Sequence, residues 1–575
     1  MWLELAERLL GVGRLRALER AARDRSEPTV FERLIAGASR TLDVTGSMAE
    51  SMPATGPVVV VANHAFGLWD PCAMCALVAG RRQDLRMMAN ERLMNVDSLR
   101  PWLIGVDVMG GANARTTNMR ALLEAMHWLA DGHVLCLFPA GQVSHRTKDR
   151  PVSVDPPWSP NVGRLMMKHK ATVVPMWFEG ENSPWFHRLG MVHPILRTAQ
   201  IPREAVKQFG QPLRVSIGRP IPHERMERFG DAQSVTDYLR VRCEMLGRDL
   251  RQRTVKAPAL GPQEPLIERA LHGPDALEEE LRALPGTELY HSEGPYDIYC
   301  ARASLIPRVL HEIGRLREVT FRAVGEGSGR AIDLDQYDGQ YRHLFIWQRE
   351  RRELVGAYRL GVARELMAAS GIKGLYLSNH FEFAPEILPR LEDSLEMGRA
   401  WVRAEYQRQP LPLFLLWRGI ALFIARHPRI GSLFGTVSVS DDFQLASKHV
   451  IVAFLHATRR ADELAELVQA KDPPTDFGAD HGDPDSWRQS LGQVAELEHL
   501  VKEVEEGRRT VPVLIRQYLK MEARVLAFNV DKDFGNVVDV LMWMDVPAIP
   551  ERMMRIYMGQ KAMDEYLAFQ AARRE

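Results

Sequence analysis

The sequence predicts two α/β domains in one chain, and three observations lead to that prediction. At 575 residues the chain exceeds what one hydrophobic core supports, so at least two domains are expected. The first half contains short apolar runs that end in polar residues, as buried strands do. A stretch punctuated by proline and glycine, residues 256–286, then separates it from a second series of strands and helices. We therefore predict a first domain over residues 1–255, a linker over 256–286 and a second domain over 287–575.

The charge balance and the cysteines exclude several classes of site. Lysine and arginine total 74 residues, as do aspartate and glutamate, so the formal net charge is zero. This balance gives no support for binding to nucleic acid, and we expect no such partner. The five cysteines are scattered, and no second pair complements the CxxC of Cys72 and Cys75. We interpret them as reduced structural thiols of a cytoplasmic protein and expect no metal site.

The first motif lies in residues 57–70, PVVVVANHAFGLWD. Residues 58–61 are four valines, which suits a strand covered on both faces, and Asn63 and His64 follow where that strand would leave the sheet. A neutral imidazole can take the proton of an attacking hydroxyl, while a carboxylate on its other ring nitrogen fixes the tautomer. We therefore predict that His64 and Asp70 form a catalytic dyad. The alternative is that Asn63 caps a helix and His64 is an ordinary surface residue.

A second motif, LCLFPAGQVSHR, contains another apolar run at residues 135–138, which opens into a turn at Gly141 and leads to Ser144. With the first motif it resembles the glycerolipid O-acyltransferase superfamily, whose members carry an Asn-His motif, an Arg motif, Phe-Pro-Glu-Gly and a Val-Pro strand. The resemblance spans roughly residues 1–230. It identifies Arg115 in GGANARTTNMR as the Arg motif and TVVPMW as the last strand. It implies that Asn63, Arg115, Gly141 and Ser144 bind substrate.

The chain departs from that pattern at two positions. Five residues separate His64 from Asp70 where the superfamily has four, so the two side chains meet only if Gly67 forms a bulge. Ala140 stands where the superfamily has glutamate. Because the glutamate motif helps hold the acceptor's phosphate in the superfamily, the resemblance implies an acceptor other than lysophosphatidic acid. Both features resemble the branch associated with amino-acid lipids.

The second half begins with a strand at residues 296–301, a helix containing IGRLREVTF, the loop DLDQYDGQYRH and the strand-like ELVGAYRL. This order resembles the GNAT fold, and more narrowly the branch of acyl-homoserine lactone synthases and ornithine-lipid N-acyltransferases. The resemblance implies that Glu396 and Arg399 are catalytic. Taken singly, each charged residue of the match would be interpreted as a solvated surface charge. The substrate-binding residues that the resemblance implies are Arg317, Phe321, Asp335, Asp338 and Arg359.

Together the two halves resemble the bifunctional ornithine-lipid synthases. That resemblance implies that the second domain attaches a 3-hydroxyacyl chain to the amine of an amino acid, ornithine being favoured. The first domain then esterifies the 3-hydroxyl. Both acyl chains would come from acyl carrier protein as phosphopantetheine thioesters, and the chemistry needs no further cofactor. The alternatives are glycine or lysine as the headgroup, a first domain that acylates a lysophospholipid, and a first half that only binds carrier or membrane.

The sequence also bears on location. Residues 1–23 predict a helix with an apolar and a basic side, which either lies on a membrane surface or packs on the first domain. No apolar run of about 18 residues is present, so we expect a protein peripherally attached to the cytoplasmic face of the inner membrane. Residues 471–486 are acidic and rich in proline, which predicts a mobile loop.

Overall fold

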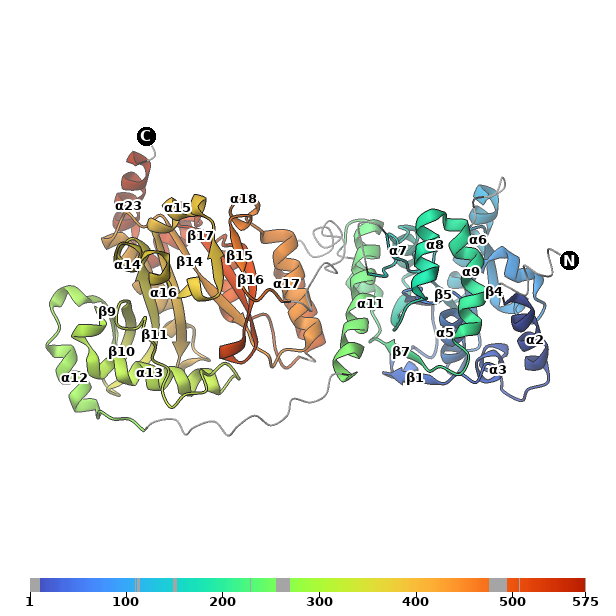
Figure 1. Ribbon diagram of the computed structural model, residues 1–575, viewed down its shortest axis with the longest axis horizontal. Helices are drawn as coiled ribbons and strands as arrows, with labels where there is room; N and C mark the ends of the chain where they lie inside the picture. Colours follow the sequence, from blue (N-terminus) through green and yellow to red (C-terminus); the bar gives the residue numbers. More distant parts are fainter. Residues whose placement is uncertain are drawn as a thin grey trace. The chain divides into compact units, whose positions relative to one another are not determined.

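A computed structural model of the chain describes residues 11–108, 110, 114–147, 152–227, 229–254, 269–474, 494–505 and 507–573. These residues form two compact units that meet in sequence near Ala257 and Pro258. Each unit has its own mixed sheet with helices packed on it, as the ribbon of Figure 1 shows. The prediction of two successive α/β domains is confirmed.

The first unit is built on a seven-stranded sheet in the order β1-β7-β6-β2-β5-β3-β4. Neighbouring strands run parallel except for β6 and β7, so β1 and β7 oppose the other five. The predicted valine strand is β2, the fourth of the seven in this order, and all five of its residues are buried. The strands are β1 (Leu42–Thr45), β2 (Val58–Ala62), β3 (Leu85–Asn90), β4 (Leu103–Val106), β5 (Val134–Leu137), β6 (Thr172–Phe178) and β7 (Leu213–Ile217).

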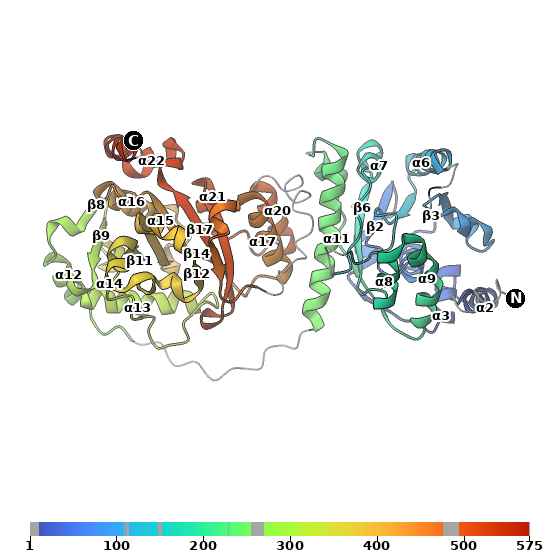
Figure 2. The same ribbon diagram turned by 45° about the horizontal axis from the view of Figure 1, so that its top comes forward.

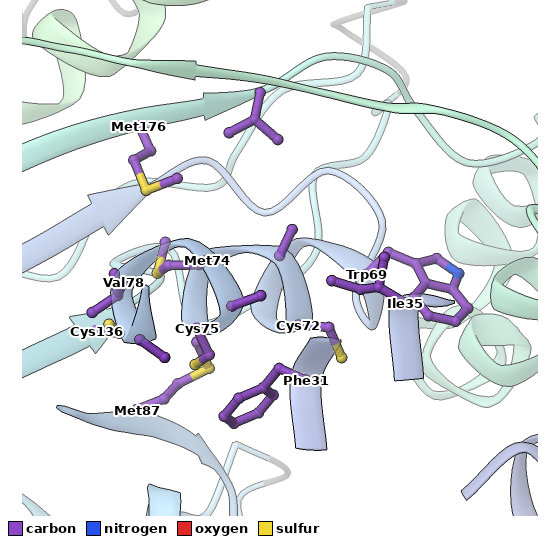
Figure 3. Close-up of a cluster of buried hydrophobic side chains, with 14 of the residues drawn as sticks. Phe31, Ile35, Trp69, Cys72, Met74, Cys75, Val78, Met87, Cys136 and Met176 are labelled. Atoms are coloured by element: carbon purple, nitrogen blue, oxygen red, sulfur yellow. The ribbon is translucent and has the colours of Figure 1, made fainter. Parts of the chain in front are cut away.

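Helix α5 (Trp69–Ala79) begins at the end of the first motif. Nine of its eleven residues are buried, so nearly all of its sides face the core. Figure 3 shows its side chains between the sheet residues Met87, Cys136 and Met176 and the helix α3. This packing fixes the start of α5, and with it the carboxylate of Asp70. The other helices of the unit are α2 (Val12–Arg23), α3 (Val30–Gly37), α4 (Met48–Ser51), α6 (Ala114–Ala130), α7 (Asn161–His169), α8 (Pro184–Val192), α9 (Pro194–Lys207), α10 (His223–Met226) and α11 (Ala232–Thr254).

The second unit contains an eight-stranded sheet in the order β16-β17-β14-β13-β11-β10-β9-β8. All neighbours are antiparallel except β13 and β14, which pair in parallel over residues 394–396 and 432–434 only. Beyond that point the two central strands share no further ladder pairs. The strands are β8 (Leu289–Glu293), β9 (Tyr296–Arg302), β10 (Arg342–Gln348), β11 (Glu353–Val362), β13 (Ser394–Val402), β14 (Ser432–Val439), β16 (Arg524–Asp531) and β17 (Val537–Asp545), with a separate pair β12 (Phe381–Phe383) and β15 (Val468–Ala470).

The apolar helix α16 (Pro410–Arg426) packs on β8 to β11, and α13 (Pro307–Arg322) contacts β13. Figure 2 shows α13 beside α12, which it contacts. The remaining helices are α12 (Pro274–Arg282), α14 (Ala363–Ser370), α15 (Leu388–Glu392), α17 (Leu445–Arg459), α18 (Asp462–Ala465), α20 (Val494–Val504), α21 (Val513–Lys520), α22 (Glu551–Met558) and α23 (Gln560–Ala572).

Helix α12 lies within the stretch that composition assigns to the linker, yet it packs into the second unit. Leu277 and Leu281 are buried against α13, and the carboxylate of Glu280 accepts hydrogen bonds from the backbone N–H groups of Arg308 and Val309. Those two groups belong to the first turn of α13, which has no preceding carbonyl partner for them. Helix α12 therefore caps α13. The rest of the predicted linker up to residue 268 lies outside the described residues.

Three further expectations concern the edges of the chain and the loops. The described part of the predicted N-terminal helix, α2, buries Leu18 and Ala22 in the first unit, while residues 1–10 lie outside the described residues. Most of the predicted loop 471–486 also lies outside them. All five cysteines are buried and free. Among the helices that the structure describes, none combines the length and apolarity needed to cross a bilayer.

Candidate active sites

The first candidate site lies where three adjacent strands of the first unit end. Strands β6, β2 and β5 are parallel neighbours, so their carboxyl ends share one edge of the sheet. Asn63 follows β2 and clamps β6: its side-chain oxygen accepts from the N–H of Phe178 and its amide donates to the carbonyl of the same residue. The backbone N–H of Ser144, after β5, donates to the carbonyl of His64. The two sequence motifs therefore meet.

His64 and Asp70 form the predicted dyad. Nδ1 of His64 lies 2.7 Å from Oδ2 of Asp70, whose side chain is fully buried. The extra residue between them is accommodated at Gly67, which has a φ of 97°, and the N–H groups of Phe66 and Gly67 both donate to the Asp70 carboxylate. The imidazole also stacks on Phe138 at 4.3 Å between ring centroids. The ring is thus held by the Asp70 carboxylate and by Phe138, with Nε2 as its remaining polar atom.

The pKa of His64 reflects two opposing effects. Burial alone lowers it, but the charge and hydrogen bond of Asp70 outweigh burial, so the pKa lies above its usual value. The same carboxylate favours the tautomer with the proton on Nδ1, which leaves Nε2 as the acceptor. The dyad is therefore a stronger base than a free imidazole.

Asp155 is a polar group of this site that the sequence reasoning missed. One of its oxygens accepts from the backbone N–H of His64 at 3.1 Å and from the hydroxyl of Ser144, and the other accepts from Trp158. Burial raises the pKa of this carboxyl. No local motif marks Asp155, because its partner His64 lies far away in the sequence. Asp155 joins the loop after β2 to the loop after β5.

The other predicted residues of the first site are spread around its rim. Gly141 is exposed and has a φ of 63°, which favours glycine at this turn. Ala140 is half-buried beside it, and Arg115 is exposed in the first turn of α6. Ser144 is buried, and its hydroxyl is used by Asp155. Among the described residues, no hydrogen bond joins Arg115 to the dyad.

The second candidate site surrounds Glu396, on β13 at the last ladder pair with β14. Its carboxylate is buried and accepts the hydroxyl of Tyr341 at 2.6 Å and the backbone N–H of Leu377 at 2.9 Å. Burial raises the pKa of Glu396 to about 7. A carboxyl with such a pKa can take up and release a proton near neutral pH. Tyr341 was not among the predicted residues, although it lies three residues after Asp338 in the loop that the sequence singled out.

Arg317 and Arg359 are buried and already paired with aspartates of that loop. Arg317 binds Asp333 at 3.0 Å and Asp338 at 2.8 Å, and Arg359 binds Asp335 at 2.7 Å. Burial alone would raise the pKa of Asp338, but the two arginines outweigh it and hold that pKa well below its usual range. Only 1% of the Arg317 side chain and 2% of the Arg359 side chain are exposed, so the two arginines mainly hold the aspartate loop in place.

Arg399 differs from the other two arginines. It has a positive φ of 51°, and its guanidinium lies over the rings of Tyr376 and Phe534. Its nearest carboxylate oxygen, on Asp333, is 3.4 Å away, and among the described residues its Nε makes no hydrogen bond. The predicted Phe321 packs edge-on against Phe534 and so helps to position the ring that the Arg399 guanidinium covers.

Two further buried carboxylates occupy the same face of the sheet as Glu396. Glu396 on β13 pairs with Phe434 on β14, and Ser438, four residues after Phe434, lies on the same face of β14 and pairs with Asp539 on β17. Glu396 and Asp539 therefore project to the same side of the sheet. Burial and the neighbouring Asp531 raise the pKa of Asp539 to about 8. The sequence reasoning did not single out either aspartate. Among the described residues no group of three or more histidines, cysteines or carboxylates is arranged to hold a metal ion.

Comparison with protein families matches the two units separately. The family described as "Acyltransferase" matches residues 28–252, and the family described as "Acetyltransferase (GNAT) domain" matches residues 316–417. The first range contains the His64–Asp70 dyad, and the second contains Glu396 and the three arginines. The chain therefore joins an acyltransferase domain to a GNAT domain, in the predicted order.

Curated relatives each match about a third or more of the chain. A glycine N(alpha)-acyltransferase of Bacteroides thetaiotaomicron is 30% identical over 187 residues, which cover 31% of this chain and 55% of that protein. A lyso-glycine lipid O-acyltransferase of Phocaeicola vulgatus is 26% identical over 187 residues, covering 31% and 64%. An L-ornithine N(alpha)-acyltransferase of Agrobacterium fabrum is 24% identical over 251 residues, covering 43% and 78%. The chain spans little more than half the length of the glycine N(alpha)-acyltransferases that it matches.

Proposed function

We propose that this chain is a bifunctional acyltransferase that makes an aminolipid: its second unit acylates the amine of an amino acid, and its first unit then acylates a hydroxyl of that product. One observation carries the proposal. Two separate buried groups suited to proton transfer near neutral pH, the His64–Asp70 dyad and Glu396, lie in two acyltransferase-type domains of the same chain. The names of the relatives, which include both an N-acyl and an O-acyl step, support the pairing.

In the amide-forming step the amino group attacks the thioester carbonyl of the donor, the C–S bond breaks and the thiolate leaves. Glu396 takes the proton that the nitrogen loses, directly or through a water molecule, and then passes it to the thiolate; its pKa of about 7 matches that task. The thioester arm reaches Glu396 from the side of β13 and β14 where the ladder between these two strands ends. Of the three arginines, Arg399 meets the substrate's anionic group, since its Nε makes only a 3.4 Å ion pair with Asp333 and no hydrogen bond among the described residues.

In the ester-forming step Nε2 of His64 removes the proton of the 3-hydroxyl as that oxygen attacks a second thioester. Asp70 stabilises the imidazolium that forms, and the proton then passes to the leaving thiolate. An acceptor that carries an amino-acid headgroup in place of a phosphate accounts for Ala140, because no glutamate motif is then needed to help bind a phosphate. The order of reactions follows: the hydroxyl reaches His64 only on the chain that the second unit has installed.

We favour ornithine as the headgroup, with glycine as the second candidate. Ornithine carries a second ammonium group, and the buried carboxylates of Asp531 and Asp539 on the face of Glu396 would complement that charge. The names of the N-acyltransferase relatives favour glycine in two cases and ornithine in one. The proposed acyl donor in both steps is acyl carrier protein, and the proposed place of work is the surface of the cytoplasmic membrane, where the product is needed.

The test is mass spectrometry of lipids from a bacterial host that lacks aminolipids and expresses the full chain. We expect a new lipid with an amide-linked 3-hydroxyacyl chain, an ester-linked second chain and an ornithine headgroup. A glycine headgroup would replace the ornithine assignment but keep the two-step chemistry. New phospholipid species without any aminolipid would contradict the proposal.

A further inference from the structure

Helices α8 and α9 form a hairpin whose tip is apolar and exposed. They lie side by side in the first unit (Figures 1 and 2), and all six residues from Met191 to Leu196 are exposed. Pro194 and the His193 ring, which accepts from the N–H of Ile195, fix the corner between the two helices. A soluble protein rarely exposes so much contiguous apolar surface unless another surface covers it. The exposed fractions are 51% for Trp185, 44% for Met191, 75% for Val192, 56% for Ile195 and 42% for Leu196.

The base of the hairpin is tied to the loop that holds the dyad. The amide of Asn182, just before α8, lies 3.3 Å from the carbonyls of Ala65 and Phe66, and Gln208, just after α9, donates to Asn182. Ser183 at the start of α8 donates both its N–H and its hydroxyl to Glu204 near the end of α9. The hairpin is thus anchored where the chemistry takes place, and only its tip is left without packing.

A second contact joins α9 to the turn after β5. Arg197, which is buried, donates to the side chain of Gln142 at 2.8 Å. A Cβ at Gly67 would come within 3.1 Å of Ile201, so α9 also touches the bulge of the dyad. Whatever surface the tip enters therefore lies at a fixed position relative to His64.

The charges of the hairpin indicate what that surface is. Residues 182–203 contain no aspartate or glutamate, and Arg188 and Arg203 are exposed on them. A tip of aliphatic side chains, on a hairpin that carries arginines and no acidic residue, is the pattern of segments that enter the boundary between lipid headgroups and acyl chains.

We infer that the α8–α9 tip docks the first unit on an anionic lipid surface, with Met191, Val192 and Ile195 entering the bilayer. The inference rests on the proposed function only in supposing that the acceptor is a membrane lipid. It assigns docking to a different segment from the N-terminal helix, because the described part of that helix turns Leu18 and Ala22 into the core of its own unit.

The test is flotation of the purified full chain with vesicles of phosphatidylcholine containing about one third phosphatidylglycerol, a proportion that gives a clearly negative surface. Val192→Asp should reduce the bound fraction about tenfold, since it replaces an apolar side chain that enters the bilayer by a negative charge, which anionic lipid repels. The matched control is Val44→Asp, which makes the same change at an exposed valine of β1 in the same unit, and it should retain binding. Vesicles of phosphatidylcholine alone should bind the unchanged protein more weakly.

A second measurement does not depend on the aspartate variants. Val192→Trp places an indole at the tip, and addition of the anionic vesicles should shift its emission to shorter wavelength, beyond any shift of the unchanged protein. Unchanged flotation of Val192→Asp, equal losses in both aspartate variants, or the same emission change with and without Val192→Trp would each overturn the inference. Flotation uses no substrate, so its result does not depend on the proposed function. If flotation contradicts the docking inference while the host still makes the aminolipid, the proposed function stands.

Discussion

Oδ2 of Asp70 lies 2.7 Å from Nδ1 of His64, although the spacing of the two residues would place them on different faces of a regular helix. The chain reaches this geometry because Gly67 adopts a left-handed φ of 97°, and because the N–H groups on either side of the bulge donate to the same carboxylate. The insertion therefore lengthens the loop without separating the dyad.

Replacing His64 by alanine should remove the ester-forming step and spare the amide-forming step. The loss of a general base corresponds to a fall of about 10² to 10⁴ in rate. The monoacylated amino acid should accumulate in cells, as measured by lipid mass spectrometry. His133→Ala is the matched control, since His133 pairs with Asp84 at 3.1 Å on the surface of the same unit. Diacylated lipid at normal levels in the His64→Ala strain would show that His64 is structural.

Gly67→Ala tests whether the bulge is needed. Alanine is strained at this φ, and its Cβ would also approach Val143 and Ile201 to 3.1 Å. We expect a loss of about 1 to 2 kcal/mol of stability and a larger relative loss of ester formation, because the strain falls on the dyad itself. Thermal unfolding and single-step assays measure the two effects. Gly56→Ala, at a positive φ with no atom near the added Cβ, controls for strain alone.

The sequence predicted those site residues that lie in the same short motif as the strand or loop that positions them. The valine strand, the dyad and the loop containing Asp335 and Asp338 follow from short motifs, because a buried strand and the polar residues at its end are neighbours in the chain. Asp155 and Asp539 could not be found in that way. Each acts through contacts with residues distant in sequence, and such contacts arise only when the sheet brings its strands together.

The pH dependence of the amide-forming step should follow Glu396. Its pKa is raised to about 7, so the carboxylate that accepts a proton is present above that pH, and the rate should fall as the pH drops below it. Tyr341→Phe removes a hydrogen bond that stabilises the carboxylate, so the midpoint should move to higher pH. Rates of thiol release from a 3-hydroxyacyl carrier measured between about pH 5.5 and 9 give both profiles. Identical profiles for the two proteins would exclude Glu396 as the titrating base.

Glu396→Gln tests the order of the two steps. It should abolish the amide and therefore all products, without loss of stability at pH 8, because the variant no longer buries a charge. Synthetic 3-hydroxyacyl amino acid should restore the diacylated lipid in the Glu396→Gln protein but not in the His64→Ala protein. Failure of rescue in a folded Glu396→Gln protein would mean that the first unit uses another acceptor.

The second unit should work alone only when it keeps α12. A chain of residues 269–575 should form the amide, whereas a chain of residues 287–575 should be less stable by several kcal/mol, since it loses the buried Leu277 and Leu281. It also loses Glu280, which caps α13. Thermal unfolding compares the two, and the substitution Glu280→Gln in the longer chain isolates the cap. Equal melting temperatures of the two chains would show that α12 is dispensable.

Asp539 provides the test of the headgroup. Its pKa is raised to about 8 by burial and by Asp531, so it is largely protonated at neutral pH until a cation approaches, and the ammonium of ornithine would lower that pKa. Asp539→Asn should then reduce kcat/KM for ornithine roughly tenfold while leaving that for glycine unchanged, which corresponds to loss of one charge-assisted contact. The exposed Asp533→Asn, on the turn that precedes the same strand, is the matched control. If Asp539→Asn changes kcat/KM for ornithine and for glycine equally, this carboxylate does not contact the side chain of the amino acid. The preference for ornithine then loses its structural support.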